Sequence, residues 1–325
     1  MNKIPIVMAF DENYAMNACV AVYSALKSKK IETCYSFYFL VRTGLPIDVT
    51  KNFYKLLNQF QGTEIEYIIV GDRFDNAFIS NHITIESYYR LLISELLPEL
   101  DKCIYLDVDI IACDDLTELW NYEIGNSIIA GVRDALASKE RYKDLKIPSP
   151  ERYIQAGVLI INLKVIKNES LLSKFIEQIK NEYQYHDQDV LNKVCYNRIT
   201  LLPLRFNVCF YLAVSKGDLE SYYSPIEVED ALNNPVIIHY AGGIKPWNSS
   251  DDYALLSHLW YQAALESPYN YDHTKYMLKG RNDTDLKNSF YETQVNRYKN
   301  SISHKIGRVV TFLPRLLKRF INKNR

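Results

Sequence analysis

The segment CIYLDVDIIACDDL, residues 103–116, holds two acidic residues directly after an apolar run. The run Cys103–Leu106 is typical of a strand buried on both faces of a sheet. Residues i and i+2 of an extended chain point the same way, so the carboxylates of Asp107 and Asp109 are expected to face one point. Carboxylates are costly to bury unless they are paired, hydrogen-bonded or bound to a metal, so this strand end is a candidate cation site. The alternative is an ordinary strand end with an N-cap and a solvated acid.

Strand and helix patterns alternate upstream of this segment. Strands are expected at Ile4–Phe10, Ser36–Val41, Glu64–Val70 and Cys103–Leu106, and helices at Ala15–Lys29, Asp48–Phe60 and Ser87–Leu97. This order predicts an α/β fold: a Rossmann-like, mainly parallel sheet with helices on both faces. Ligands of such sheets bind beyond the carboxyl ends of the strands, which is where Asp107 and Asp109 fall.

The pattern loosens downstream of residue 116. Strand-like runs occupy Ser127–Val132, Val158–Ile161 and Val236–Ile238, and helical periodicity covers Leu171–Tyr185 and Asp251–Leu265. From about residue 267 the chain is polar and has no clear period. We therefore predict a main domain over residues 1–266 and a C-terminal extension over residues 267–325.

The charge of the chain is unevenly distributed. Its total is −1, but residues 301–325 carry seven Lys or Arg and no acidic residue, which leaves −8 for the rest. In this tail, Leu316, Leu317, Phe320 and Ile321 fall on one helical face. A basic amphipathic helix is typical of binding to anionic lipid, with packing on the main domain as the alternative. No nucleic-acid-binding motif accompanies the charge, so a nucleic-acid partner is not expected.

The cysteines and the termini bear on the cellular compartment. Six cysteines are scattered without a C-x-x-C pair, so buried, reduced thiols are expected. No signal peptide is expected, because the short run Ile4–Phe10 leads directly into polar residues. No apolar stretch approaches the roughly 18–20 residues that span a bilayer. We predict a cytoplasmic protein associated peripherally with the inner face of the plasma membrane through its basic tail.

A divalent cation is the natural ligand of the acidic pair, because hard oxygen ligands suit Mg²⁺ or Mn²⁺. A third ligand candidate, His239, ends an apolar strand in VIIHYAGGIKPWN, although a lone histidine is more often an ordinary core or surface residue. The turn after it contains Gly242 and Lys245, which suit phosphate binding. Two aspartates and one histidine leave coordination positions for diphosphate oxygens, and nitrogen among oxygens favours Mn²⁺.

Phosphatases of the haloacid-dehalogenase type also carry D-x-D after an apolar strand. They place it near the chain start and follow it with G-D-x-x-x-D. Here the segment GDRFD, residues 71–75, is one residue too short and precedes the acidic pair. The order of the motifs therefore disfavours this class.

Six segments in order resemble glycosyltransferase family 8, the retaining GT-A enzymes related to bacterial lipopolysaccharide galactosyltransferases and glycogenin. The segments are FDENYAMNACVAVYSAL, YYRLLISELLPELDKCIYLDVDII, AGVLIINL, HDQDVLN, RFN and HYAGGIKPW. The resemblance covers about residues 4–265. It implies a GT-A nucleotide-diphospho-sugar transferase fold, with the acidic pair as the metal-binding DXD motif.

The resemblance also implies roles for individual residues. Asp107, Asp109 and His239 would bind Mn²⁺, with Mg²⁺ as the alternative ion. The residues that would hold the nucleotide are Ala9, Asp11, Asn13, Tyr14 and Val108. Among them, Tyr14 would stack on uracil, and Val108 would touch the ribose through its backbone. Gly242 and Lys245 would grip the diphosphate.

Further residues are implied at the donor sugar. Arg90 would contact phosphate and sugar, and Gln188 would lie beneath the anomeric carbon. The residues that would line the sugar are Asp134, Gln155, Ala156, Asp187, Gln188 and Asp189. The catalytic set would be Arg90, Asp187 and Gln188. His82, Ile85 and Ser87 match positions that sense the nucleotide or the acceptor.

Structural alternatives exist for several of these residues. Tyr14 could pack at the start of a helix, and Arg90 could form a surface ion pair with Glu86. Asp187 could cap the helix that begins QDVLN while also binding sugar. Asp189 could be a first-turn acid favoured by the helix dipole.

The chain departs from the family pattern at Gln155, where many relatives carry Asn, and GVRDALA matches the donor loop only loosely. The sugar specificity of the galactosyltransferases therefore cannot be copied to this chain.

These observations predict a retaining enzyme that moves a hexose from UDP-galactose or UDP-glucose to a hydroxyl of a lipopolysaccharide, glycolipid or other cell-surface glycan. Gln188 is a poor nucleophile, so a front-face route is favoured over a covalent intermediate. The contrasting hypothesis is an inactive nucleotide-sugar-binding protein. The intact set of candidate ligands and sugar-lining residues favours the enzyme.

Overall fold

The computed structural model describes residues 3–80, 84–135, 138–209, 222–243, 245–247 and 257–269. His82 and the basic tail, residues 301–325, lie outside this part of the chain. The predicted boundary between a main domain and an extension at residues 266 and 267 stays a prediction, because little of the extension is described.

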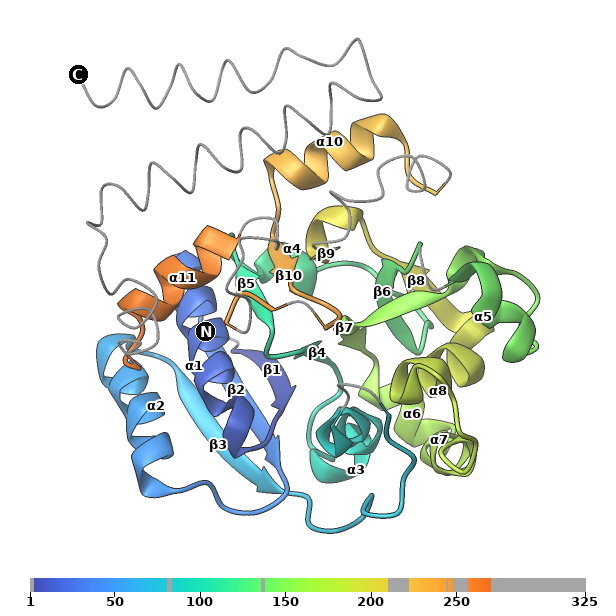
Figure 1. Ribbon diagram of the computed structural model, residues 1–325, viewed down its shortest axis with the longest axis horizontal. Coiled ribbons are helices and arrows are strands. Elements are labelled where there is room, and N and C mark those ends of the chain that lie inside the picture. The colour runs from blue at the N-terminus through green and yellow to red at the C-terminus, as the bar shows by residue number, and fades with distance from the viewer. Residues whose placement is uncertain are drawn as a thin grey trace. The chain divides into compact units, whose positions relative to one another are not determined.

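A seven-stranded sheet forms the centre of the described fold, with the strand order β3-β2-β1-β4-β7-β6-β8 (Figure 1). Its strands are β1 Ile4–Ala9, β2 Tyr35–Val41, β3 Glu64–Ile69, β4 Cys103–Leu106, β6 Ile129–Arg133, β7 Ile154–Ile161 and β8 Ile199–Leu201. Strand β7 runs antiparallel to β4 and β6, and the other neighbouring pairs are parallel. The predicted mainly parallel sheet is therefore confirmed.

Helices cover both faces of this sheet, as predicted (Figure 1). One face packs against α1 Ala15–Ser28, α2 Ile47–Gln59 and α11 Ser257–Glu266, and the other against η2 Ile85–Leu92, α3 Ile93–Leu96, α6 Leu163–Asn168, α7 Leu172–Gln178 and α8 His186–Cys195. Alternation along β1 divides its side chains between the two cores, because Ile6 and Met8 belong to one and Val7 to the other. The central strands β1 and β4 are thus apolar on both faces, which explains their continuous apolar sequences.

A second, three-stranded sheet leads away from the end of β4. It contains β5 Ile110–Ala112, β10 Ile237–His239 and β9 Val208–Cys209 in the order β5-β10-β9. The chain leaves the main sheet at Asp107 and joins this small sheet one residue after Asp109. The remaining elements are η1 Glu12–Tyr14, α4 Thr117–Trp120, α5 Ser138–Asp144, η3 Pro150–Arg152, η4 Tyr196–Arg198, η5 Leu204–Phe206 and α10 Pro225–Asn233.

Two helix predictions need correction. The segment predicted as a helix at Ser87–Leu97 is mostly the 3-10 helix η2, followed by the single turn α3. The consecutive residues 88–92 are all buried, so this segment has no solvent-exposed face of the kind a surface α-helix shows. The helix predicted at Leu171–Tyr185 ends at Gln178, whose carbonyl accepts hydrogen bonds from the backbone and the side chain of Asn181.

The sequence did not predict the strands β5, β8 and β9 or the helices α4, α5, α6 and α10, which are short or lie in polar surroundings. All six cysteines are free, and the two at positions 34 and 113 are only partly buried. Among the described residues, no helix combines the length and the apolar character needed to cross a bilayer.

Candidate active site

The two sheets bring Asp107, Asp109 and His239 together. The backbone N–H of Asp107 donates to the carbonyl of Gly157 on β7 at 2.8 Å, which extends the β4–β7 pairing by one residue. Strand β10 pairs antiparallel with β5, so His239 lies opposite Ile110. The backbone N–H of Tyr240 then donates to the carbonyl of Asp109 at 2.9 Å. The small sheet therefore places a histidine from late in the chain beside the acidic pair.

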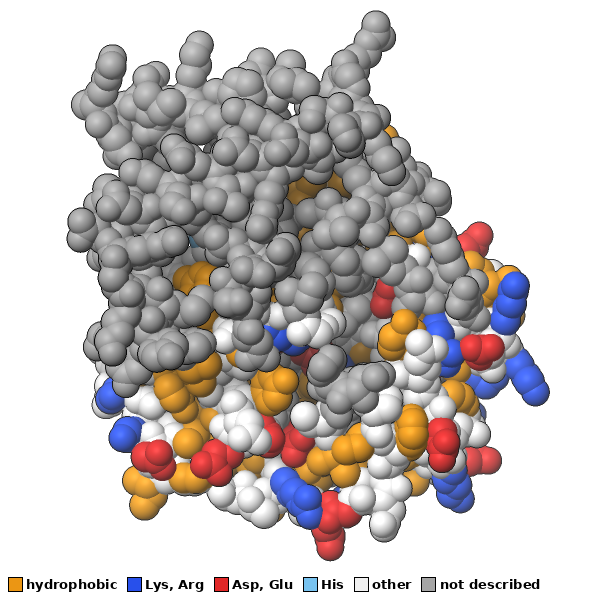
Figure 2. Space-filling model, viewed as in Figure 1, with side chains coloured by type: hydrophobic (Ala, Val, Ile, Leu, Met, Phe, Trp, Pro, Cys, Tyr) orange, Lys and Arg blue, Asp and Glu red, His pale blue; other side chains and the backbone are white. Residues whose placement is uncertain are grey.

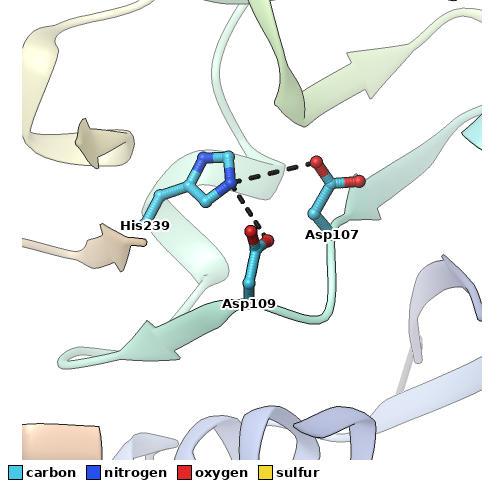
Figure 3. Close-up of side chains that lie close together, drawn as sticks. All are labelled: Asp107, Asp109 and His239. Carbon is cyan, nitrogen blue, oxygen red and sulfur yellow. Dashed lines mark ion pairs between the residues drawn. The ribbon is translucent and has the colours of Figure 1, made fainter. Parts of the chain in front are cut away.

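The three side chains point toward one another (Figure 3). His239 Nε2 lies 3.1 Å from Asp109 Oδ1 and 3.9 Å from Asp107 Oδ2. One ligand atom from each residue lies within 4.8 Å of the others. His239 is buried, whereas both carboxylates are partly exposed, so the cluster is open to a ligand on the carboxylate side.

The surroundings of this cluster fit a divalent cation. A set of two carboxylate oxygens and one imidazole nitrogen suits Mn²⁺. It suits Mg²⁺ less well, because Mg²⁺ prefers oxygen ligands alone. The second ring nitrogen, Nδ1, lies 3.0 Å from Asn207 Oδ1, which can accept its proton, so Nε2 is the nitrogen that would bind a cation in place of its own proton. Gly157 makes room for the cluster, because a Cβ there would lie 2.2 Å from His239 Cε1 and 2.7 Å from Asp107 Oδ2.

Lys245 contacts the same cluster from the turn after β10. Its ammonium group donates to Asp109 Oδ2, and to the carbonyl of Tyr240 at 2.7 Å. Gly242 in this turn has φ +88°, which is in the left-handed region that favours glycine. Burial would raise the pKa of Asp109, but Lys245 and His239 outweigh burial and lower it far below its usual range. Burial lowers the pKa of His239, yet the Asp109 carboxylate more than compensates and raises it to about 10.

Arg90 links the acidic cluster to the helix that carries the predicted catalytic residues. Its guanidinium is buried, pairs with Asp107 at 2.8 Å and Asp187 at 2.9 Å, and donates to the carbonyl of Ala156. The guanidinium carbon lies 4.3 Å from the centre of the Tyr105 ring, whose hydroxyl donates to Asp107 at 3.1 Å. The alternative of a surface ion pair with Glu86 is therefore wrong, because Arg90 is only 6% exposed and pairs with these two aspartates.

Helix α8 begins at His186, so Asp187 lies in its first turn and does not cap it. The capping alternative for Asp187 is therefore wrong. His186 has φ +46°, an uncommon conformation for a bulky residue that costs about 1–3 kcal/mol. Its buried ring compensates by accepting the backbone N–H of Ser80 at 2.9 Å and stacking on Phe78. Burial raises the pKa of Asp187 to about 6, although Arg90 lowers it.

The carboxamide of Gln188 is held on both sides. Its Oε1 accepts the backbone N–H of Ala156 at 2.9 Å, and its Nε2 donates to Asp134 at 3.1 Å and to the Tyr153 hydroxyl at 3.2 Å. Tyr153 donates in turn to Asp189 at 2.7 Å. Asp134, Ala156 and Gln188, which were all predicted from the sequence, thus lie together on adjoining elements.

Asp189 is fully buried beneath this group. It accepts from Arg141 Nη2 at 2.8 Å and from the backbone N–H of Tyr185 at 2.8 Å, in addition to Tyr153. These contacts tie the start of α8 to β7 and α5. Through the Tyr153 hydroxyl, Asp189 also helps to hold Gln188 in place. The predicted contact of Asp189 with a donor sugar stays a prediction.

Gln155 points into the same region from the start of β7. Its Oε1 accepts the backbone N–H of Gly157 at 2.6 Å and Asn207 Nδ2 at 2.8 Å. This side-chain oxygen is therefore held by the protein, and a contact between Gln155 and a sugar would have to come from Nε2.

The residues predicted for the nucleotide lie at the carboxyl end of β1. Asp11 caps η1, accepting the backbone N–H of Tyr14 at 3.0 Å and the Asn13 side chain at 2.8 Å. Tyr14 and Ala9 are partly buried. Val108 is buried between the two metal-ligand candidates. The roles of these residues in nucleotide binding, and those of Ile85 and Ser87, stay predictions.

Sequence reasoning missed four residues that build the site. They are Tyr105, Tyr153, Gly157 and Asn207. Gly157 and Asn207 lie inside the quoted segments AGVLIINL and RFN, which was the available signal. No periodicity could assign them a role, because their partners come from other elements.

The sheet and its acidic strand end define a class of protein, the glycosyltransferases with a GT-A fold. The chain belongs to glycosyl transferase family 8, whose model matches residues 5–251. This confirms the family and the enzyme class that the sequence motifs predicted.

Individual relatives agree with this assignment. General stress protein A of Bacillus subtilis is 29% identical over 254 residues, which cover 75% of this chain and 87% of the relative. A lipopolysaccharide 1,2-glucosyltransferase of Escherichia coli is 29% identical over 252 residues, which cover 75% of this chain and 73% of that relative. The galactosyltransferase LgtC, solved in complex with donor and acceptor sugar analogues, superposes with a TM-score of 0.70 at 28% identity, covering 81% of this chain and 96% of LgtC.

Proposed function

We propose that this glycosyltransferase transfers a hexose from UDP-galactose or UDP-glucose to a hydroxyl of a lipopolysaccharide, glycolipid or other cell-surface glycan, with retention at the anomeric carbon and with Mn²⁺ as cofactor. The cluster of Asp107, Asp109 and His239, which Arg90 and Ala156 link to the Gln188 carboxamide, is the observation that carries this proposal. The names of two relatives, a lipopolysaccharide glucosyltransferase and a galactosyltransferase with sugar analogues, support the substrate class.

The difficult step of such a reaction is departure of the diphosphate while positive charge grows on the anomeric carbon. Asp107, Asp109 and His239 would hold the ion, which would supply Lewis-acid stabilisation of the departing phosphate oxygens. Arg90 keeps Asp107 in place through their ion pair. Lys245 contacts Asp109 here, and a short movement of its flexible side chain would bring the ammonium group to a phosphate.

Retention is assigned to a front-face route, in which the departing phosphate oxygen accepts the proton of the attacking hydroxyl. Gln188 is neutral and its oxygen accepts the Ala156 N–H, which makes it a poor nucleophile. Asp187 is paired with Arg90, and Asp189 is fully buried. Detection of a covalent glycosyl adduct on Asp187 or Asp189 by mass spectrometry would contradict this route.

Substitution of one metal-ligand candidate tests the proposed function. Asp109→Asn removes a charge from the cluster and is expected to lower UDP release by about 100-fold or more, because the leaving group loses its stabilisation. The exposed neighbour Asp114 provides the matched control, and Asp114→Asn should retain wild-type activity. Turnover of Asp109→Asn within a few-fold of wild type in saturating Mn²⁺ would count against the metal assignment.

The location of the enzyme is part of the same proposal. The basic tail, residues 301–325, would hold the protein on the inner face of the plasma membrane, where a lipid-linked acceptor is available. Its partners would be the UDP-sugar, the glycan acceptor and anionic lipid.

A further inference from the structure

The two ring nitrogens of His239 have different partners. Nε2 faces Asp107 and Asp109, and Nδ1 faces Asn207 Oδ1 at 3.0 Å. A histidine binds a metal through an unprotonated nitrogen, so the proton must stay on Nδ1 and needs an acceptor there. The Cys209 thiol lies 4.0 Å from Nδ1 and is a weak acceptor, which leaves Asn207 as the partner that fixes the ring.

The orientation of the Asn207 amide is determined at both ends. Its oxygen accepts from His239, and its nitrogen donates to Gln155 Oε1 at 2.8 Å. A flipped amide would place an N–H group against Nδ1–H and an oxygen against an oxygen, so neither bond would survive. Asn207 is 1% exposed, so bulk water does not reach either hydrogen bond.

Gln155 is fixed in turn by the backbone of its own strand. Its Oε1 also accepts the N–H of Gly157, at 2.6 Å. Gly157 is the residue whose missing Cβ makes room for His239 and Asp107. The bonds thus form a continuous relay from the β7 backbone through Gln155 and Asn207 to the imidazole of His239.

We propose that Gln155 and Asn207 are positioning residues that set the affinity of His239 for the divalent cation. This inference rests on the proposed function, because it concerns the same metal site. It gives Gln155 a role other than the sugar contact expected from the sequence. Asparagine at this position is shorter by about 1.5 Å, one carbon–carbon bond, and would keep at most one of the two bonds that Gln155 Oε1 accepts.

The test measures Mn²⁺ affinity of the full chain by electron paramagnetic resonance of the free ion, without any sugar substrate. Asn207→Leu is expected to weaken Mn²⁺ binding by about 10- to 100-fold, the loss typical of partners of metal-bound histidines. Asn207→Asp keeps an acceptor for Nδ1–H but loses the N–H group that binds Gln155 Oε1, so it should weaken Mn²⁺ binding by only about 3- to 10-fold, as Gln155→Leu does. Gln155→Leu should weaken binding by about 3- to 10-fold, and Gln155→Glu, which can still accept both N–H groups, should restore it.

Asn192→Leu is the matched control. Asn192 is also a buried asparagine whose amide binds β7, at Ile154, but it touches no metal-ligand candidate. The inference predicts wild-type Mn²⁺ affinity for this variant even if its melting temperature falls. Equal weakening in Asn192→Leu and Asn207→Leu would overturn the inference, because general destabilisation would then explain both.

Other outcomes are equally decisive. If Asn207→Leu binds Mn²⁺ with wild-type affinity, the positioning role of Asn207 is overturned, while the proposed metal site itself is not affected. If Asn207→Leu weakens Mn²⁺ binding and Gln155→Leu does not, the positioning role of Gln155 is overturned. If Asn207→Leu does not fold, the pair Gln155→Leu and Gln155→Glu decides. A wild-type protein that binds no Mn²⁺ would overturn the proposed metal dependence as well, so the two failures are distinguishable.

Discussion

Gly157 illustrates at the residue scale how a missing side chain defines the site. A Cβ at this position would meet both His239 and Asp107 at distances that real contacts do not show. Strand β7 lies between β4 and β6, so its backbone has little freedom to retreat. The space for the metal-ligand candidates His239 and Asp107 therefore depends on this one glycine.

Gly157→Ala is expected to weaken Mn²⁺ binding by about 100-fold, because His239 or Asp107 must move, and to cost about 1–3 kcal/mol of stability through overpacking. Titration with Mn²⁺ and urea unfolding measure the two effects. Gly44→Ala is the control, since a Cβ there meets nothing within 4 Å. Unchanged Mn²⁺ affinity in Gly157→Ala would show that the cation does not bind between these side chains.

Asp187 gives a pH dependence with a defined sign. Its pKa is raised from 3.8 to about 6 by burial. Between these values the folded protein holds a proton that the unfolded chain has lost, so rising pH lowers the free energy of unfolding through this group. Above pH 6 the free energy of unfolding is lower by the full contribution of Asp187. This contribution is on the order of 2–3 kcal/mol, at about 1.4 kcal/mol per pKa unit.

Comparison with Asp187→Asn isolates this contribution. From pH 4 to pH 7.5 the variant should gain stability relative to wild type, because it has no carboxyl group to ionise. Urea unfolding at a series of pH values measures the difference. A difference that stays constant over this range would contradict the raised pKa.

At the scale of elements, the direction of β7 decides which residues reach the site. Because β7 runs antiparallel to β4, with Leu106 opposite Val158, the residues before Val158 extend past the end of β4 beside Asp107. Gln155, Ala156 and Gly157 thereby line the cluster. Tyr153 directly precedes β7. Its hydroxyl joins the start of this strand to α8 through hydrogen bonds with Asp189 and Gln188.

Tyr153→Phe tests this junction between β7 and α8. The hydroxyl orients Gln188, so its loss should lower UDP release by about 10-fold while Mn²⁺ affinity and KM for the UDP-sugar stay near wild type. Steady-state kinetics separate these quantities. Tyr196→Phe is the control, because the Tyr196 hydroxyl binds Ser149 and does not contact Gln188. Equal effects in both variants would argue against a specific role for Tyr153.

The sequence could predict the parts of the fold that are encoded locally. Apolar runs and helical periods identified β1 to β4, α1 and α2, and the position of Asp107 and Asp109 followed from strand geometry. The roles of Asn207, Gly157 and Tyr153 could not follow from such patterns. They depend on the reversal of β7 and on the pairing of β5 with β10, which are long-range contacts that leave no period in the sequence.

At the scale of the whole molecule, charge separates the tail from the remainder. On the face shown in Figure 2, acidic and basic side chains of the described residues are intermixed. The tail, residues 301–325, carries only basic charges together with bulky apolar residues. This contrast is the basis for proposing that the tail binds anionic lipid.

Removal of residues 301–325 is expected to abolish sedimentation with anionic liposomes and to leave hydrolysis of the UDP-sugar unchanged. Each basic residue near an anionic surface contributes about 1 kcal/mol, so binding should also weaken strongly with salt. Neutral liposomes serve as the control. Full retention of the truncated protein on anionic liposomes would refute the membrane proposal.

Asp107, Asp109 and His239 are proposed to hold a cation that activates a UDP-sugar. The most direct test is slow hydrolysis of a panel of UDP-hexoses by the purified full chain, with Mn²⁺ or with EDTA. We predict release of UDP from UDP-galactose or UDP-glucose in Mn²⁺ and none in EDTA. Mn²⁺-dependent UDP binding without turnover, with or without an added glycan acceptor, would favour a nucleotide-sugar-binding protein, and the absence of UDP binding would contradict the account of the site.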